Sequence, residues 1–469
     1  AGVGGATIWG GKGDTIVGGS GSALIDGSAG SQLISGGPGA STILGGAGDT
    51  ITGTSSSGAS VIIGAAGDTI TGGLGSDLVN GLAGSQSITG SGGGITVWGG
   101  AGDTITGGAG SALIDASAGN QNIIGGPGSS TILGGSGDRI TGSTGTGLST
   151  IIGAKGATIN GGSNIDLINA LAGSETVTGG AGHMTVWGGA GDSITGGTLS
   201  LIADGTAGNQ KIAGGLGSST ILGGAGDTIT GSNGTGASVI VGAKGDAITS
   251  GTGSDLVNAL AGAQLVTGGA GSVTVWGGAG DTISGGVGNS LIDGTAGSQK
   301  ITGGAGTGII LGGAGDTISG STGSGTTTVI GAASDSITGG SGSDLINALA
   351  GSQSITGGTG STTVWGGAGD TILGGSGNMT VAFDNTHFPG LEYVGDNGTK
   401  GGNISVTGFS PPGGQTAGDL ILFPQETSMA INNVVTSAQA SGSNTVITLP
   451  DGTTMTLVGI TSINSSFFA

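Results

Sequence analysis

The sequence predicts an all-β protein, a parallel β-solenoid (β-roll) of about 20 coils with a small β cap module at its C-terminal end. Two nested repeats and an unusual glycine content lead to this prediction. The five tryptophans stand 89 residues apart, at Trp9, Trp98, Trp187, Trp276 and Trp365. Inside each 89-residue unit, apolar residues recur about every nine residues. Glycine supplies 122 of the 469 residues, without the three-residue period of collagen.

The short apolar segments are expected to be β-strands. Each holds two or three apolar residues, as in Thr42–Leu44, and this is too short for a helix. Many of these residues are β-branched, and the glycines between the segments supply tight turns. We therefore expect two strands in each coil and five coils in each 89-residue unit.

The two strands of a coil differ in their outward residues. One strand reads Asp-Thr-Ile-Thr, as in Asp68–Thr71, so that a single Ile points inward and the flanking Thr point outward. The sequence thus predicts a Thr-rich ladder on one face.

The other strand carries two adjacent apolar residues, such as Val97 and Trp98. Because successive side chains point to opposite faces, we expect one of the two to lie outside, in an apolar stripe that monomers rarely leave uncovered. The expected stripe is Ile25, Leu44, Ile63, Val79, Trp98 and Ile114. The alternative is a slightly kinked strand that buries both residues.

The composition changes near residue 380. All six phenylalanines, beginning with Phe383, and the single tyrosine lie beyond that point. We expect residues 1–380 to form the Gly-rich solenoid array and residues 381–469 to form the C-terminal β module that caps it. The stretch Val446–Ile460 alternates like a β-hairpin with its turn at Asp451 and Gly452.

Charge and composition exclude several classes of function. The chain has 27 acidic and 7 basic residues and a formal charge of −20, which repels nucleic acid. No apolar run reaches the roughly 18 residues of a membrane span. The only histidines are His183 and His387, and there is no cysteine, so neither a Ser-His-Asp arrangement nor a His-ligated metal is expected. We predict that the protein is not an enzyme.

Two segments carry a resemblance to a known family. The segment Gly72–Asn80, GGLGSDLVN, fits the nonapeptide GGxGxDxUx, and on this motif the chain resembles the RTX (repeats-in-toxin) proteins, whose tandem repeats form calcium-bound β-rolls. The segment Val406–Phe423 is similar to a phrase near the C-terminus of RTX proteins exported by type I secretion. The resemblance implies an uncleaved C-terminal export signal and a secreted protein, extracellular or at the cell surface.

The same resemblance implies Ca²⁺ bound by the sixth-position Asp of successive stacked repeats. Here that Asp recurs once per 89 residues and has no stacked partner. It stands at Asp77, Asp166, Asp255 and Asp344.

A shortened turn places other aspartates one coil apart. Two stacked carboxylates about 5 Å apart repel each other, and a calcium ion between them relieves the repulsion. The predicted calcium ligands are three such pairs: Asp49 with Asp68, Asp227 with Asp246, and Asp316 with Asp335. The alternative is that these Asp, with Gln residues at the same edge, cap backbone amides of the turns without a metal.

Together these features predict a secreted structural protein that self-assembles into filaments, a surface layer or a biofilm matrix. Other copies of the chain are the expected partners, with cell-surface polysaccharide as a further candidate. The first residues match the interior of a repeat, so we expect an open strand edge that docks head to tail on the C-terminal module of another copy.

Two other functions stay open. One is ice binding by the Thr ladder, as in antifreeze solenoids, although five residues interrupt the ladder: Leu33, Arg139, Lys211, Leu265 and Lys300. The other is an adhesin stalk in which the array is a spacer.

Overall fold

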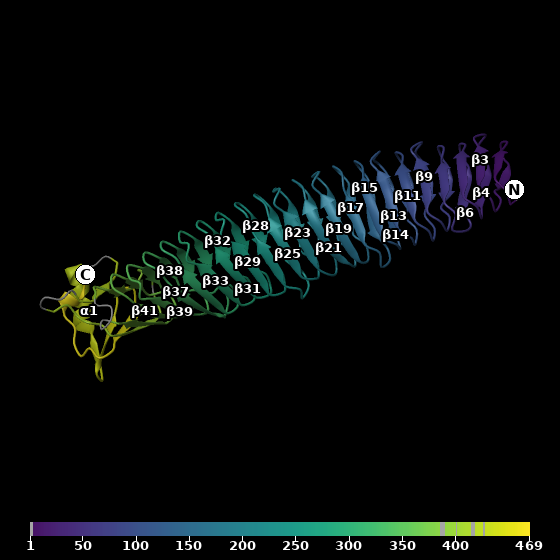
Figure 1. The fold of residues 1–469 in the computed structure, drawn as a ribbon. Helices are drawn as coiled ribbons and strands as arrows, with labels where there is room; N and C mark the ends of the chain where they lie inside the picture. Colours follow the sequence, from purple (N-terminus) through teal and green to yellow (C-terminus); the bar gives the residue numbers. More distant parts are fainter. Residues whose placement is uncertain (1–2, 385–389, 400, 414–417, 425–426) are drawn as a thin grey trace. The chain divides into compact units, whose positions relative to one another are not determined.

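The computed structural model describes residues 3–384, 390–399, 401–413, 418–424 and 427–469. The chain divides into two compact units, Ala1–Gly236 and Ala237–Ala469. In each unit the strands alternate between two parallel sheets in chain order (Figure 1). The predicted all-β parallel solenoid is therefore confirmed: strands β1 to β42, at two per coil, make 21 coils. His387 and residues 414–417 of the secretion-like phrase lie outside the described residues.

We call the two sheets the tryptophan sheet and the threonine sheet, after their outward residues. In the first unit the tryptophan sheet consists of β1 (Ala6–Trp9), β3 (Ala23–Gly27), β5 (Ser41–Gly45), β7 (Ser60–Ile63), β9 (Asp77–Gly81), β11 (Ile95–Gly99), β13 (Ala112–Ala116), β15 (Ser130–Gly134), β17 (Ser149–Ile152), β19 (Ile165–Ala170), β21 (His183–Gly188), β23 (Leu201–Gly205) and β25 (Ser219–Gly223). Its threonine sheet consists of β2 (Thr15–Val17), β4 (Leu33–Gly37), β6 (Thr50–Thr54), β8 (Thr69–Thr71), β10 (Ser87–Thr89), β12 (Thr104–Thr106), β14 (Asn122–Gly126), β16 (Arg139–Ser143), β18 (Thr158–Asn160), β20 (Thr176–Thr178), β22 (Ser193–Thr195), β24 (Lys211–Ala213) and β26 (Thr228–Thr230).

The second unit repeats this arrangement. Its tryptophan sheet consists of β27 (Ser238–Val241), β29 (Asp255–Ala259), β31 (Val273–Gly277), β33 (Ser290–Gly294), β35 (Gly308–Gly312), β37 (Thr326–Ile330), β39 (Ser343–Ala348), β41 (Ser361–Gly366), β43 (Met379–Phe383) and β45 (Asn403–Thr407). Its threonine sheet consists of β28 (Ala247–Thr249), β30 (Leu265–Thr267), β32 (Thr282–Ser284), β34 (Lys300–Thr302), β36 (Thr317–Ser319), β38 (Ser336–Thr338), β40 (Ser354–Thr356), β42 (Thr371–Leu373), β44 (Tyr393–Gly395) and β46 (Leu420–Leu422).

The core lies between the two sheets and is built almost entirely of stacked Ile and Val. Ile25 pairs with Ile43 in the tryptophan sheet, and Ile34 pairs with Ile51 in the threonine sheet. All four side chains are fully buried. Burying one such side chain contributes about 1.5–3 kcal/mol, and most coils supply one from each sheet.

Glycines are required where a side chain from the next coil fills the corner between the sheets. A Cβ on Gly99 would lie 2.2 Å from Gln121 Oε1, and a Cβ on Gly188 would lie 2.3 Å from Gln210 Oε1. These distances are far below van der Waals contact, so an Ala at either position would force the buried Gln side chain to move.

The parallel pairing continues past residue 380. Strand β43 pairs with β41 and with β45, while β44 pairs with β42 and with β46. The change in composition therefore falls inside a run of parallel pairing, and a domain boundary at residue 380 stays a prediction.

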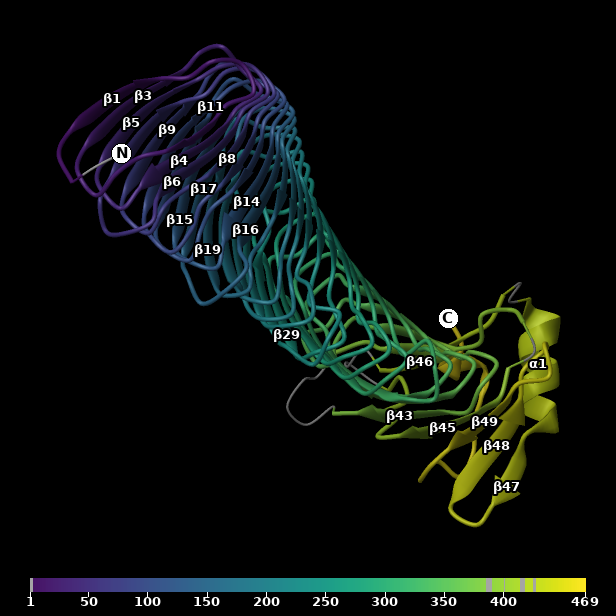
Figure 2. The same ribbon diagram turned by 90° about the vertical axis from the view of Figure 1, so that its right-hand side faces the viewer.

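A small non-solenoid segment follows β46. Helix α1 (Ser428–Ser437) was not predicted; the side chain of its N-cap residue Thr427 accepts the Ala430 amide. The helix packs beside β48 (Figure 2). Strands β47 (Gln439–Ser441), β48 (Asn444–Thr448) and β49 (Thr454–Leu457) are antiparallel neighbours, and η1 (Ser465–Phe467) is a single 3₁₀ turn. The predicted hairpin at Asp451 and Gly452 is thus confirmed.

Strand β49 also pairs in parallel with β45, so the hairpin covers the last strand of the tryptophan sheet. Within the described residues, no helix is both long enough and apolar enough to cross a membrane.

Candidate functional site

The outer surface of the tryptophan sheet, which we call the tryptophan face, presents two outward columns. The tryptophan column contains each Trp and its register partners. In the first unit it runs Trp9, Asp26, Leu44, Ile63, Asn80, Trp98, Asp115, Leu133, Ile152, Asn169, Trp187, Asp204 and Leu222. In the second unit it runs Val241, Asn258, Trp276, Asp293, Leu311, Ile330, Asn347, Trp365 and Ala382. The tryptophan column therefore repeats every five coils, with the residues Trp, Asp, Leu, Ile (or Val) and Asn in that order.

The flanking column lies two residues earlier in each strand. Over the first eleven coils it runs Thr7, Leu24, Thr42, Val61, Leu78, Thr96, Leu113, Thr131, Thr150, Leu167 and Thr185. Leucine stands in this column where the tryptophan column has Asp or Asn. The apolar surface therefore alternates between the two columns.

The predicted apolar stripe was wrong in half of its members. Ile25, Val79 and Ile114 are fully buried in the core. Leu44, Ile63 and Trp98 do face outward, and Ile63 and Trp98 are 41% and 38% exposed. The kinked strand that buries both apolar residues is therefore absent at these coils. The physical reason is the phase of the strand: in Leu-Ile-Asp the second apolar residue points inward, whereas in Ile-Leu-Gly the first does.

A hollow of about 430 Å³ opens on the tryptophan face of the first unit. It is lined by Thr150, Ile151, Ile152, Leu167, Asn169, Leu171 and Trp187. Asn169 is the short residue of its column, between Ile152 and Trp187. The hollow therefore lies at a coil where a short polar residue of the tryptophan column stands between two large apolar side chains.

The outer surface of the threonine sheet, the threonine face, carries short hydroxyl side chains. Thr50 and Thr52 pair with Thr69 and Thr71, all four outward. This confirms the predicted Thr ladder. The five interrupting residues named above also point outward from their strands, which breaks the regular array that an ice-binding face requires.

A buried column of Asp, Gln and Glu fills one corner between the sheets. Asp49 Oδ1 accepts the Gln32 amide at 2.7 Å, and its Oδ2 accepts the Gly46 amide at 2.7 Å. Asp68 Oδ1 in turn accepts the Asp49 amide at 2.8 Å, and Oδ2 accepts the Ala65 amide at 2.7 Å. All four carboxylate oxygens of this pair thus hold backbone N–H groups.

The pair Asp316 and Asp335 has the same arrangement: Asp335 Oδ1 accepts the Asp316 amide at 3.0 Å. Asp227 lies in the first unit and Asp246 in the second, and each accepts an amide of its own turn, from Gly224 and Ala243 respectively. Burial raises the pKa of Asp68, Asp316 and Asp335, and the neighbouring carboxylate adds to the rise for Asp68 and Asp335.

The sixth-position aspartates lie at the other corner of the coil. Asp77 accepts the Ser60 amide at 2.9 Å, and its register neighbours are Ser60 and Ile95. Asp166, Asp255 and Asp344 occupy the same place one, two and three repeats later, with no acidic register partner. The predicted absence of a stacked partner is confirmed.

The arrangement of the paired aspartates does not fit a calcium ion between the carboxylates. Calcium takes six to eight oxygen ligands, whereas each of the four carboxylate oxygens here already accepts a backbone N–H group. Among the described residues, no group of three or more His, Cys, Asp or Glu is arranged to hold a metal ion. Calcium at the six predicted aspartates stays a prediction.

Three acidic residues of the column were missed by sequence reasoning: Glu175, Glu392 and Asp419. Glu175 stands where the neighbouring repeats carry Gln86 and Gln264, and in the preceding coil Ala157 stands where they carry Asp. Glu175 is buried, and neither of its carboxylate oxygens has a hydrogen-bond partner. Burial, and secondly the charge of Asp192, raise the pKa of Glu175 to about 8. The sequence signal for Glu175 was a double replacement relative to the neighbouring repeats: Ala157 replaces an Asp, and one coil later Glu175 replaces a Gln.

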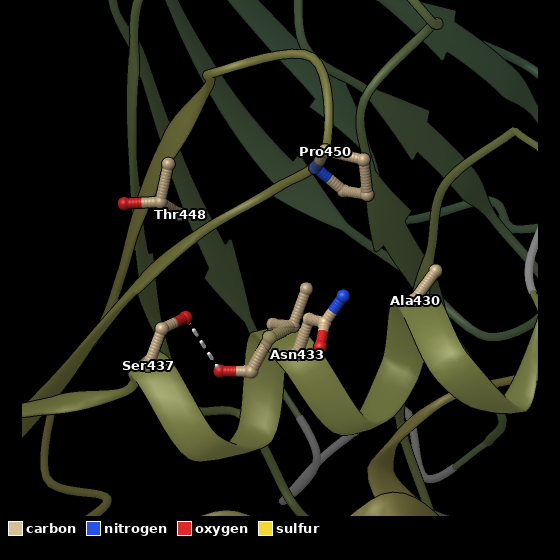
Figure 3. Close-up of a pocket in the computed structure, with 6 residues that line it drawn as sticks. Ala430, Asn433, Ser437, Thr448 and Pro450 are labelled. Carbon is tan, nitrogen blue, oxygen red and sulfur yellow. Dashed lines mark hydrogen bonds between the residues drawn. The ribbon is translucent and has the colours of Figure 1, made fainter.

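The C-terminal segment offers a different kind of cavity. A pocket of about 270 Å³ lies between α1 and β48 (Figure 3). It is lined by Ala430, Asn433, Val434, Ser437, Thr448 and Pro450. Ser437 Oγ donates to the Val434 carbonyl within the helix. The lining side chains are apolar or carry neutral hydroxyl and amide groups.

Comparison with protein families gives a repeated match. The model described as RTX calcium-binding nonapeptide repeat (4 copies) matches residues 9–43, 26–53, 62–94, 98–132, 115–145, 152–183, 160–195, 204–236, 240–275, 258–292, 276–310 and 331–352. These segments together span more than half of the chain. No curated protein and no solved structure matches the chain.

Proposed function

Because the chain belongs to the family of RTX calcium-binding nonapeptide repeat proteins, we propose that it is an extracellular structural protein that self-associates through its tryptophan face. Proteins built from these repeats are typically secreted, and they are structural or toxin-like more often than enzymatic. The proposed assembly is a filament, a surface layer or a biofilm matrix.

The half-exposed apolar surface of the tryptophan face carries this proposal. Trp98 and Trp187 are 38% and 39% exposed, and Leu113, Ile152 and Ile202 are also exposed. No described strand of the tryptophan sheet contains Lys or Arg. Soluble monomers rarely expose contiguous apolar patches beyond a few hundred Å², and a stable interface buries about 800 Å² per partner. A surface that continues over successive coils can supply such an area.

A matched pair of substitutions tests the proposal. Ile152 points outward from the tryptophan face, and Ile124 points outward from the threonine face. We expect Ile152→Lys to weaken self-association at least tenfold, because it places a charge in a desolvated interface, whereas Ile124→Lys leaves it unchanged. Sedimentation velocity over a concentration series measures both, and electron microscopy shows the form of the assembly. Equal losses in the two variants would contradict the use of the tryptophan face.

Calcium binding by the paired aspartates is tested separately. An ion between Asp49 and Asp68 would draw charge from the Asp68 oxygen that accepts the Asp49 amide, and we expect it to weaken that hydrogen bond. Equilibrium dialysis gives the number of ions bound per chain. Hydrogen exchange of the Asp49 amide, faster with calcium than without, would place an ion at this pair; unchanged exchange despite bound calcium would place the ions elsewhere.

A further inference from the structure

The tryptophan column has an internal mirror symmetry in its residue types. Reading outward from Trp98, the neighbours on the two sides are Asn80 and Asp115, and then Ile63 and Leu133. Asn matches Asp in shape, and Ile matches Leu in size and polarity. The same order surrounds Trp276, with Asn258 and Asp293 as its neighbours.

The flanking column follows the same mirror. On either side of Thr96 stand Leu78 and Leu113, and then Val61 and Thr131. The whole face therefore reads nearly the same in both directions along the stack of coils. A surface with this property is complementary to a second copy of itself turned end for end.

We infer that two copies pack tryptophan face against tryptophan face with their coil orders reversed, so that Trp coils face Trp coils. This inference rests on the proposed function and names the register of that association. In this register each Asp of the tryptophan column faces an Asn, each Leu faces an Ile, and the flanking leucines face each other. Trp faces Trp, an arrangement that aromatic rings favour.

The aspartates decide among the possible registers. They are the only charged side chains in the tryptophan column, and all are negative. Because the tryptophan column repeats every five coils, two copies with reversed coil order can be aligned in five registers. One register sets Asp opposite Asp, three set Asp opposite Trp, Leu or Ile, and the inferred one sets Asp opposite Asn. A buried charge without a partner is strongly unfavourable, and like charges repel. If the two copies instead run in the same coil order and lie in register, Asp115 of one copy lies opposite Leu113 in the flanking column of the other copy. Among the reversed registers, only the inferred one gives every Asp an Asn as its partner.

The Asn side chains of the tryptophan column are positioned to donate a hydrogen bond to the facing Asp. Asn80 and Asn169 each accept a backbone amide on Oδ1, at 3.1 Å from Leu82 and Leu171, which leaves the Nδ2 group to donate across the interface. Asp115 likewise accepts the Ser117 amide on Oδ1 at 3.1 Å, which leaves Oδ2 as the acceptor. Asn and Asp thus hold the same local turn, so exchanging one for the other preserves the fold of the monomer.

This equivalence gives a clean experiment on the full chain. The first variant, Asn80→Asp with Asn169→Asp, makes Asp face Asp in the inferred register. The second replaces all four aspartates of the tryptophan column, Asp26, Asp115, Asp204 and Asp293, by Asn, and makes Asn face Asn in every alignment that sets Trp opposite Trp. A control, Asn122→Asp with Asn160→Asp, adds the same two charges to outward positions of the threonine face. Self-association is measured by sedimentation velocity at low ionic strength, where charge effects are least screened.

We expect the first variant to associate at least tenfold more weakly than the wild type, and the second variant and the control to stay within about threefold of it. An equimolar mixture of the first and second variants should regain wild-type association, because every altered Asp then faces an Asn. If the first variant associates as well as the control, or the mixture fails to recover, the register is overturned while self-association stands. A wild-type chain that stays monomeric overturns both proposals.

Discussion

The two faces of the solenoid share one core and differ in everything they present to solvent. On the inner side both sheets contribute fully buried Ile, such as Ile132 and Ile140. On the outer side the threonine face carries short hydroxyls with Arg139 and Lys211 among them, whereas the tryptophan face carries Trp, Leu and Ile with Asp as its charge. The difference teaches that the repeat fixes the fold from within and leaves each outer face free to be specialised.

Substitutions that create cavities test whether the two sheets contribute equally to the stability of the core. Ile132→Ala in β15 and Ile140→Ala in β16 should each lower the free energy of unfolding by about 2–5 kcal/mol, because each deletes fully buried methyl groups. The outward neighbours provide controls: Thr131→Ala and Thr141→Ala should change it by less than about 0.5 kcal/mol. Urea denaturation measures all four, and a large difference between the two Ile variants would show that the sheets do not share the core equally.

The corner between the faces should respond to pH through Glu175. An unfolded chain releases this proton near the ordinary value of 4.5, whereas the folded chain holds it to about pH 8. The stabilising contribution is therefore complete below pH 4.5 and is lost as the pH rises toward 8. Glu175→Gln should remove this slope and stabilise the protein by about 2–4 kcal/mol at pH 9. Thermal midpoints of both proteins from pH 4 to 9 test the prediction, and parallel curves would contradict it.

The glycines at the same corner allow a smaller and sharper test. Gly188 meets the long Gln210 side chain, so Gly188→Ala should cost about 1–3 kcal/mol through overpacking. A Cβ on Gly81 would lie 2.8 Å from Ile88 Cδ1 and 3.0 Å from Asp103 Oδ2, yet the next two repeats carry Ala170 and Ala259 at its place. Gly81→Ala should therefore be tolerated within about 0.5 kcal/mol. Equal destabilisation by the two substitutions would mean that the side chain across the corner is not what requires glycine.

Much of the fold followed from periodicity alone. The 89-residue spacing of Trp and the single inward Ile of Asp-Thr-Ile-Thr were enough to predict the coils, the Thr ladder and the shared column of Asp49, Asp68 and Gln86, because stacking in register repeats every position. Adjacent apolar pairs were harder, since Leu24-Ile25 and Ile43-Leu44 look alike until the inward residue is known. The polar residue that follows Leu24-Ile25, Asp26, was the cue to the correct phase.

The energetics of the carboxylates could not be predicted from residue types. Stacked Asp at one coil spacing suggested repulsion between charges, and spacing says nothing of where N–H groups point. In the structure the Asp49 amide points at the Asp68 carboxylate. The mirror order of the tryptophan face was equally hidden, because its residues are about 17 to 19 positions apart in the chain and become neighbours only after the coils stack.

Between coils, the backbone amides of the buried column donate in one direction, since the amide of one coil is received by the carboxylate of the coil that follows it in the chain. The stack is thus a polar template. A coil that docks on the N-terminal side of formed structure finds its acceptor already in place, whereas a coil that docks on the C-terminal side must bring its acceptor with it. The two directions of growth therefore differ in the group that waits for a partner: a carboxylate oxygen on the N-terminal side and a backbone amide on the C-terminal side.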